Sequence, residues 1–397
     1  MDRAFRPLDG VRVVEMTHMI MGPSCGQFLA FLGADVVKVE PPEGDKTRAL
    51  SGMGRGFFPT FNRGKRSVTL DLKVPEGRAA LDRLLADADV FVENFRDESL
   101  AKMGYAPDTL RARYPKLIIA SCKGFLHGPY ERRTAMDEVV QMMTGMAYMT
   151  GPTGRPLRIG SSANDIMGGL VGAYAVLGAL LERQETGAGR ALRVGLFENC
   201  LLLVAQHMVQ YDIEGVEAPP MPERLFAWPV YDIFETKEGR QIFLGAVTEG
   251  QWVALCRLLG LDALLEDPGL QKRMDQIEAR HRTVPIFAAA VRTRGFDELC
   301  ALCEEAGLPF APIRRPAEMY DDPHVNRPGG LQRASLPEGG SFRAPGVPFE
   351  ADGASPALAL ADVPANGADT DAVLGGLGFS PAEIAAASGR TKTAAVL

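Results

Sequence analysis

The stretch VRVVEMTHMIMGPSCGQFLAFLGADVVKVE, residues 11–40, decides the fold. It opens with VRVVEM (11–16), a β-rich apolar run, and it closes with DVVKVE (35–40), a second run of the same kind. Between them, CGQFLAFLGA (25–34) places its apolar residues at helical spacing. A strand, a helix and a strand in this order predict two parallel strands that are joined by a helix.

The same alternation continues along the first half of the chain. Further strands are predicted at DVFVEN (89–94), at KLIIASCKGF (116–125) and at the start of 190–209, with helices at 76–88 and 106–115. This alternation is typical of an α/β fold in which helices cover a parallel sheet. Ligands of such sheets bind beyond the carboxyl ends of the strands, so the turn that contains His18 is predicted to lie at the ligand-binding edge.

A mostly helical region follows this alternation. MDEVVQMMTGMAYM (136–149) is predicted to form one helix, and the apolar run after Asp165 a second helix that ends near Gly187. The second run contains four glycines, at positions 168, 169, 172 and 178. A glycine costs about 1 kcal/mol in a helix interior relative to alanine. Four of them therefore predict close packing against another backbone.

The chain length of 397 residues favours about two domains. We expect a large domain from residues 1–215, completed by a return segment at 325–397, and a smaller domain at 225–320. The smaller domain begins with a predicted hairpin at 229–247 and ends with a helical run at 281–306. The return segment is rich in Pro and Gly at first, which is typical of a long connection.

The composition is that of an ordinary globular protein, with 46% apolar and 23% charged residues. The net charge of −7 disfavours nonspecific binding to nucleic acid, which depends on a basic surface. The N-terminus has no apolar signal core, and the longest apolar run, 166–181, is shorter than the roughly 18 residues of a membrane span. We therefore expect a soluble, cytoplasmic protein without nucleic-acid or membrane partners.

Several sequence motifs with known chemistry are missing. No glycine fingerprint of a dinucleotide site follows the first predicted strand, and no P-loop or H-E-x-x-H motif occurs. The five histidines lack metal-ligand spacing, and the pair Cys300 and Cys303 has no companion pair. We therefore expect neither a bound metal nor a resident cofactor.

Asp165 precedes the apolar run and has two interpretations. Asp at the start of a helix commonly caps the first free N–H groups. Asp can also act as a covalent nucleophile when a site positions it and removes its water. The residue type alone favours the cap.

Ordered segments across nearly the whole chain resemble the family III CoA-transferases. The segments that carry the resemblance are PLDGVRVVEMTHMIMGP (7–23), FLGADVVKVEPPEGD (31–45), FNRGKRSVTLDLKVPEGR (61–78), ADVFVENFRDESLAKMG (88–104), SCKGF (121–125), MDEVVQMMTGMAYMTGP (136–152), TGAGRALRVGLFEN (186–199), APGVPF (344–349) and DTDAVLGGLGFSPAEI (369–384). The resemblance implies a large domain with a Rossmann-like sheet built from both chain ends, a smaller inserted α+β domain, and an interlocked homodimer. It also implies that Asp165 is the catalytic nucleophile.

The resemblance further implies the residues that bind coenzyme A, which is part of the substrate rather than a cofactor. These are Leu70, Asp71, Leu72, Lys73, Asn94, Phe95, Arg96, Lys102, Thr134, Ala135, Met136 and Asp137. The partners that it implies are an acyl-CoA thioester and a carboxylic acid. Lys73, Arg96 and Lys102 could pair with phosphate groups.

The segments 16–23 and 40–48 resemble members that act on branched C4–C5 dicarboxylates. The reaction so implied moves CoA from the C1 to the C4 carboxylate of mesaconate. A dicarboxylate needs a cationic anchor, for which Arg48, Arg55 and Arg63 are candidates. The expected substrate pocket contains His18, Ile20, Met21 and Arg48.

Three alternatives remain open. The first is intermolecular CoA transfer from succinyl-CoA to a dicarboxylate. The second is an α-methylacyl-CoA racemase, although Met136 stands where racemases of this family carry a histidine and cannot take a proton from carbon. The third is an acyl-CoA-binding protein without turnover.

Overall fold

The structure is a computed structural model that describes residues 5–224, 227–356 and 362–390. The chain divides into two compact units. Unit 1 comprises Met1–Pro222 and Pro323–Leu397, and unit 2 comprises Glu223–Asp322. Each unit has a sheet and a hydrophobic core of its own.

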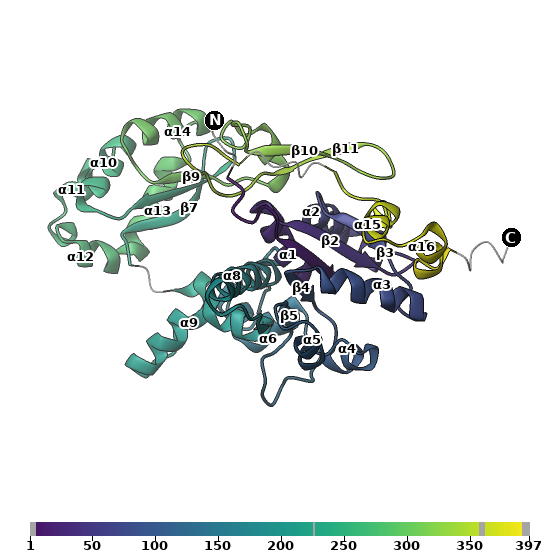
Figure 1. The fold of residues 1–397 in the computed structure, drawn as a ribbon. Helices are drawn as coiled ribbons and strands as arrows, with labels where there is room; N and C mark the ends of the chain where they lie inside the picture. The colour runs from purple at the N-terminus through teal and green to yellow at the C-terminus, as the bar shows by residue number, and fades with distance from the viewer. Residues whose placement is uncertain (1–4, 225–226, 357–361, 391–397) are drawn as a thin grey trace. The chain divides into compact units, whose positions relative to one another are not determined.

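Unit 1 is built around a six-stranded sheet in the order β3-β2-β1-β4-β5-β6. Strands β2, β3, β4 and β5 of this sheet are labelled in Figure 1. The strands are β1 (Arg12–Met16), β2 (Asp35–Glu40), β3 (Arg66–Thr69), β4 (Val90–Glu93), β5 (Ile118–Lys123) and β6 (Ala191–Gly195). Every neighbouring pair is parallel. This is the strand order of a doubly wound dinucleotide-binding sheet, whose order reverses between β1 and β4. The α/β prediction is confirmed.

Helices cover both faces of the sheet. Those of the first half are α1 (Met21–Phe31), α2 (Phe57–Asn62), α3 (Pro75–Ala86), α4 (Asp97–Met103) and α5 (Pro107–Arg113), with short 3-10 turns at Lys46–Ala49 and Gly52–Gly56. Those that follow are α6 (Asp137–Met143), α7 (Met146–Thr150), α8 (Ala163–Thr186), α9 (Leu196–Glu214), α15 (Thr370–Gly376) and α16 (Pro381–Ala387). Successive strand residues alternate between two cores: Val13 lies in the core under α1 and α8, and Val14 in the core under α3, α15 and α16.

The sequence prediction missed strand β3, and it placed no strands in the return segment. β3 has only four residues, RSVT, and they follow a charged run, so their apolar signal is weak. The return segment contains the hairpin of β10 (Leu331–Ser335) and β11 (Ser341–Pro345). It completes unit 1 with this hairpin and two helices, while all six strands of the main sheet come from residues 12–195.

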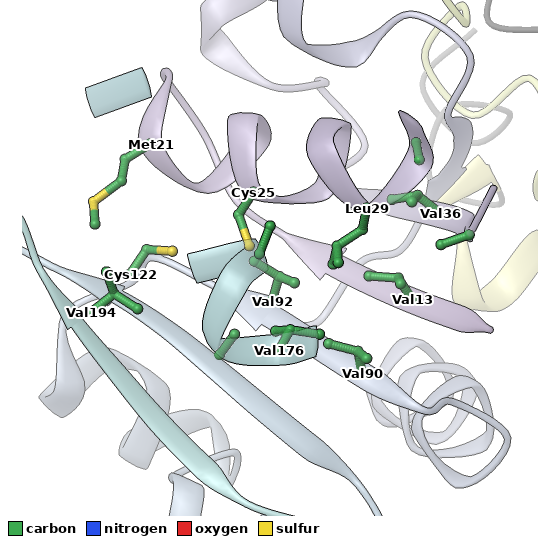
Figure 2. Close-up of a cluster of buried hydrophobic side chains, with 14 of the residues drawn as sticks. Val13, Met21, Cys25, Leu29, Val36, Val90, Val92, Cys122, Val176 and Val194 are labelled. Carbon is green, nitrogen blue, oxygen red and sulfur yellow. The ribbon is translucent and has the colours of Figure 1, made fainter. Parts of the chain in front are cut away.

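α1 and α8 pack closely against each other over the sheet. Met21 and Cys25 of α1 lie in the same buried cluster as Val176 of α8 and Cys122 of β5 (Figure 2). A Cβ atom on Gly169 would lie only 2.5 Å from Ser24 Cβ and 2.7 Å from the Met21 carbonyl oxygen. The predicted close backbone packing is therefore confirmed. Gly178 is different, because a Cβ there would meet no described atom within 4 Å.

The predicted single helix at 136–149 is wrong. The segment forms α6 and α7, and Gly145 lies between them with φ +86°. A left-handed residue cannot continue a right-handed helix, and glycine adopts this conformation at little cost. The periodicity of the apolar residues continues across the break, which explains the error.

Charged side chains are buried at the carboxyl half of strands β1 and β2. Glu15 and Lys38 are fully buried, and Lys65 is nearly so. Lys65 Nζ lies 2.7 Å from Glu15 Oε2, and Lys38 Nζ lies 3.1 Å from Asp45 Oδ2. Burial lowers the pKa of Lys65 to about 8, against the opposing effect of Glu15. These pairs compensate charges whose burial alone would be costly.

Unit 2 is an α+β unit with a three-stranded antiparallel sheet in the order β7-β8-β9. Its elements are β7 (Val230–Glu235), β8 (Gln241–Ala246), α10 (Glu249–Leu259), α11 (Asp262–Glu266), α12 (Arg273–Glu278), α13 (Arg280–Val291), α14 (Phe296–Glu305) and β9 (Phe310–Pro312). The predicted hairpin at 229–247 is confirmed. The helical run predicted at 281–306 is two helices, which a turn near Gly295 separates.

In the described part of the chain, α8 is the one helix whose length and composition would suffice to cross a membrane. It packs between α1, α9 and strand β5, as a core helix of a globular unit does. The apolar composition of α8 is thus weak evidence for a membrane span.

Candidate active site

Asp165 lies in the first turn of α8 and is half-buried. Within the described residues, its carboxylate has no hydrogen-bond or ion-pair partner. Burial, followed by the negative charge of Asp137, raises the pKa of Asp165 to about 7, while Arg158 acts in the opposite direction. A carboxylate that is partly desolvated and unpaired is a stronger nucleophile than a solvated one.

Asp137, not Asp165, caps the start of α8. The N–H of Asp165 donates to Asp137 Oδ2 over 3.0 Å. The residue at the N-cap position, Ser162, makes no side-chain capping bond. The interpretation of Asp165 as a helix cap is therefore wrong, and its carboxylate is left available for chemistry.

The start of α8 is also tied to the start of α9. Asn164 Nδ2 donates to the Leu196 carbonyl over 3.1 Å, and Asn199 Nδ2 donates to the Asn164 carbonyl over 3.0 Å. Both asparagines are buried. Because these bonds join two helix N-termini, they fix the backbone on which Asp165 is carried.

Three side chains form hydrogen bonds with the backbone of the turn between β1 and α1. The Asn94 amide accepts from the His18 N–H and donates to the His18 carbonyl, and Lys38 Nζ donates to the Thr17 carbonyl over 2.7 Å. Met19 has φ +63°, which is strained for a residue with a side chain, and its N–H donates to Thr47 Oγ1. The turn leads directly into Met21, whose side chain and carbonyl pack against Gly168 and Gly169, one turn after Asp165.

Two cavities at the carboxyl ends of the strands share Phe95 as a lining residue. The first, cavity A, has a volume of about 810 Å³, and the second, cavity B, about 550 Å³. Of the predicted CoA-binding and pocket residues, cavity A is lined by His18, Asn94, Phe95, Arg96, Thr134 and Ala135, and cavity B by Leu70, Asp71, Leu72, Lys73 and Phe95. The structure thus gathers ten predicted residues around one continuous edge of the sheet.

Cavity A contains bases that the sequence prediction did not single out. Lys123, at the end of β5, lies 2.8 Å from Glu93 Oε1 and 3.0 Å from Asp97 Oδ1, and Arg193 lies 2.9 Å from Asp97 Oδ2. Burial acts to raise the pKa of Asp97, but hydrogen bonds from both bases lower it. Lys123 could have been found from its place at a strand end. Arg193 had no comparable signal, since only the fold brings β6 beside β5.

Two further bases give cavity A a positive rim. Arg132 is exposed at the cavity, and Arg133 stacks over the Tyr130 ring with 5.0 Å to the centroid. Arg96 donates to Thr134 Oγ1 over 3.0 Å and makes no ion pair with any described residue. Such arginines are suited to bind phosphate oxygens.

Seven predicted site residues do not line either cavity: Ile20, Met21, Arg48, Lys102, Met136, Asp137 and the predicted nucleophile Asp165. Ile20 and Met21 are buried, while Met136 is 62% exposed. Arg48 Nη2 lies 2.6 Å from Glu40 Oε1, and Arg48 Nε lies 2.7 Å from Glu40 Oε2. A substrate carboxylate at Arg48 would first have to displace Glu40.

The other two candidate anchors are engaged as well. Arg55 Nη2 lies 3.0 Å from Glu338 Oε1 at the surface. Arg63 is buried and donates to the Pro345 carbonyl, and burial lowers its pKa. No group of three or more His, Cys, Asp and Glu side chains suited to hold a metal occurs among the described residues.

The sequence profile described as CoA-transferase family III matches residues 8–370. The chain belongs to this family. It is therefore a CoA-transferase, and the resemblance stated from its motifs is confirmed.

Two relatives of this CoA-transferase illustrate the similarity in sequence. It is 35% identical to a succinate–glutarate CoA-transferase of Agrobacterium fabrum, over 81% of this chain and 84% of that protein. It is 32% identical to a succinyl-CoA:mesaconate CoA-transferase of Haloarcula hispanica, over 80% of this chain and 83% of that protein.

A solved structure shows the same fold. A CaiB/BaiF family protein from Brucella suis matches with a TM-score of 0.84 at 31% sequence identity. The match covers 94% of this chain and all of that chain. The six-stranded parallel sheet with its smaller antiparallel sheets is thus the architecture of the family.

Proposed function

We propose that this CoA-transferase moves CoA between dicarboxylates, with Asp165 as the covalent nucleophile. The observation that carries the proposal is the unpaired, half-buried Asp165 carboxylate at the rigid start of α8. Its pKa of about 7 means that the ionised form is present at neutral pH without strong solvation.

The proposed reaction uses two kinds of intermediate. The Asp165 carboxylate attacks the thioester carbonyl, so that a mixed anhydride forms and CoA leaves as thiolate. The thiolate attacks the aspartyl carbonyl, which gives an aspartyl-CoA thioester and frees the first acid as carboxylate. The second acid attacks this thioester to form a new anhydride, and the thiolate then attacks the acyl carbonyl. Asp165 is released as carboxylate, so the charges and bonds balance over the cycle.

The two cavities supply the proposed CoA site. Cavity A, with Arg96, Arg132 and Arg133, is suited to the phosphate groups and the pantetheine arm, and cavity B to the apolar face of adenine. Apolar glycine-rich packing after Asp165 limits the entry of water from the side of α1. This matters because water would hydrolyse either intermediate.

We propose succinyl-CoA as donor and a C4–C5 dicarboxylate as acceptor. The names of the relatives support this choice, since succinate and a second dicarboxylate, glutarate or mesaconate, occur in both. Intramolecular transfer from C1 to C4 of mesaconyl-CoA is the second candidate, which the resemblance of residues 16–23 and 40–48 favours. A racemase is disfavoured, because the thioether of Met136 cannot act as a base.

The resemblance to the family supports two further proposals. The first is an interlocked homodimer, and the second is a cytoplasmic location. The chain carries apolar side chains on the outer surfaces of α8 and α9, among them Tyr174 and Ile213, which are 76% and 77% exposed. A second copy would cover such a surface.

Chemical trapping of the covalent intermediate tests whether Asp165 is the nucleophile. The protein is incubated with succinyl-CoA, quenched with hydroxylamine or borohydride, and digested for peptide mass spectrometry. We expect a hydroxamate or a reduced side chain at Asp165, and neither in Asp165→Ala. Modification of another carboxylate in place of Asp165, at the rate of turnover, would overturn the assignment.

The acceptor is tested in the same preparation. Intermolecular transfer requires a free acid such as mesaconate or glutarate, and its rate rises with the acid concentration. Intramolecular transfer converts mesaconyl-C1-CoA into the C4 isomer without any free acid. Chromatography of the two isomers, with and without added acid, separates the two candidates.

A further inference from the structure

Arg158 lies in the loop before α8 and contacts both this loop and the first turn of α6. Its Nε donates to the Ile159 carbonyl over 3.2 Å, and its Nη2 donates to the Ser161 carbonyl over 3.0 Å. The guanidinium also faces the first turn of α6, where Nη2 lies 3.6 Å from Asp137 Oδ1 and Nη1 lies 3.5 Å from Glu138 Oε2. The side chain is 26% exposed.

Asp137 is the other end of this connection. It is buried, and its Oδ2 accepts the Asp165 N–H while its Oδ1 accepts from the Gln141 amide. The Gln141 Oε1 accepts in turn from the Ile159 N–H over 2.9 Å. Hydrogen bonds therefore link the loop after Arg158 to α6 and α6 to α8, and the 3.6 Å ion pair between Arg158 and Asp137 adds a contact between the same loop and α6.

We propose that Arg158 is a positioning residue for the reaction: it holds Asp137 in the orientation that caps α8, and its positive charge offsets the negative charge of Asp137 beside Asp165. The proposal deepens the proposed function, because it rests on Asp165 as the nucleophile. Arg158 itself touches neither substrate nor reacting atoms in this role.

The charges near Asp165 explain why a cation is needed. Asp137 approaches the Asp165 main chain and disfavours a second negative charge, whereas Arg158 favours it. Glu138 faces Arg158 from α6, and the Cys200 thiol faces Asp137 from α9. Arg158 is the one described cation that lies beside both Asp137 and Glu138, so without it nothing described would offset the effect of the Asp137 charge on Asp165.

The test compares Arg158→Gln with Arg158→Lys over pH 5.5–9.5. The conversion of succinyl-CoA and free mesaconate or glutarate is followed as kcat/KM. In Arg158→Gln we expect the rising limb to move up by about half to one pH unit, since a charge at this distance and exposure has an effect of that order. The rate at pH 7 then falls about threefold and recovers at pH 9. Arg158→Lys keeps the charge, so its midpoint stays near that of the wild type.

A second readout does not depend on turnover. Carbodiimide and an amine label carboxyl groups in their protonated form, and the labelling of the Asp165 peptide is followed by mass spectrometry across the same pH range. We expect the midpoint to be near 7 in the wild type, higher in Arg158→Gln and unchanged in Arg158→Lys. The control is Arg155→Gln, which removes an exposed arginine from the same loop.

The outcomes separate the two proposals. Equal loss of rate at every pH, with an unmoved labelling midpoint, would mean that Arg158 merely holds the loop, and it would overturn the inference. A shifted labelling midpoint with no CoA transfer by the wild type would keep the role of Arg158 and refute the proposed function. Thermal unfolding of each variant shows whether it still folds.

Discussion

At the scale of single residues, the central observation is that Asp137 and Asp165 have different roles. Asp137 caps α8, and this leaves the carboxylate of Asp165 without a partner in the described chain. The sequence could assign only one of these roles to Asp165, because nothing in it shows that residue 137 comes back to the start of α8. The apolar run that follows Asp165 is visible in the sequence, whereas the residue that caps α8 is not.

The ionisation of Asp165 predicts a pH-dependent stability. Its folded pKa is raised from 3.8 to about 7, so the native state binds more protons than the unfolded state between these values. Stability from this group is therefore lost as the pH rises from about 4 to 7. As the pH rises over this range, we expect the free energy of unfolding of Asp165→Asn to increase by about 1–2 kcal/mol relative to that of the wild type, after allowance for solvent screening.

Urea unfolding at pH 5 and pH 8 measures this difference. The relevant quantity is the free energy of unfolding of Asp165→Asn minus that of the wild type at each pH. Asp9→Asn serves as control, since Asp9 is exposed at the surface. An equal difference at both pH values would contradict the raised pKa.

The backbone conformation of Met19 predicts that a glycine at this position gives a more stable protein than an alanine. Its φ of +63° is strained for any residue with a Cβ, and its side chain is 43% exposed, so that little packing is lost by truncation. We expect Met19→Gly to be more stable than Met19→Ala by about 1 kcal/mol. Chemical denaturation of the two variants measures the difference. A more stable alanine variant would show that the turn relaxes out of the left-handed region.

At the scale of elements, the contact of α1 with α8 explains why α8 contains so many glycines. Three of the four glycines lie where a Cβ would come within 3.0 Å of α1, and the fourth, Gly178, lies in open space. The contact brings the end of the β1 turn beside the first turns of α8, so helix packing and the site are set by the same residues.

The different surroundings of Gly169 and Gly178 predict that substitution by alanine has opposite effects on stability at the two positions. Gly169→Ala places a methyl group against the Ser24 side chain and the Met21 carbonyl, and we expect a loss of about 1–3 kcal/mol. Gly178→Ala meets no described atom, and we expect a gain of about 0.5–1 kcal/mol from helix propensity. Thermal unfolding of the two variants is the measurement. Equal effects would contradict the close packing of α1 and α8.

The elements also show where prediction from sequence ends. Short apolar runs identified β1, β2, β4, β5 and β6, because burial of a central strand on both faces leaves a strong signal. β3 is shorter and follows charges, and the break at Gly145 interrupts a helical periodicity that continues on both sides. Buried ion pairs such as Glu15 with Lys65 are 50 residues apart in the chain, so only the fold reveals them.

The same holds for the site. The predicted CoA-binding residues of cavities A and B could be named from motif resemblance, and the strand order then brings them together. The partner of a long side chain could not be named in this way. Arg48 was expected to face a substrate carboxylate, and it lies against Glu40 through two nitrogen atoms. Side-chain pairing depends on loop conformation, which short motifs do not encode.

At the scale of the whole molecule, the outer surfaces of α8 and α9 bear on the proposed interlocked homodimer. The large apolar side chains there include Leu170, Tyr174 and Leu181 on α8 and Leu202, Val209 and Ile213 on α9, all more than half exposed. An isolated chain would expose these apolar side chains to water, and exposed apolar surface favours association with other proteins. In the proposed homodimer, a second copy of the chain would cover this surface without any additional partner.

The homodimer predicts a mass of twice the 42.8 kDa of one chain, measured by light scattering and by mass photometry. Because interlocked chains cannot separate without unfolding, we expect this mass both at micromolar and at nanomolar concentration, whereas an ordinary face-to-face dimer dissociates on dilution. Tyr174→Glu places a charge on the apolar surface, and we expect it to refold to monomers or aggregates, while Gln184→Glu on the same helix refolds as the wild type does. A wild-type chain that is monomeric at micromolar concentration would exclude the dimer, and one that dissociates only at nanomolar concentration would exclude the interlocking.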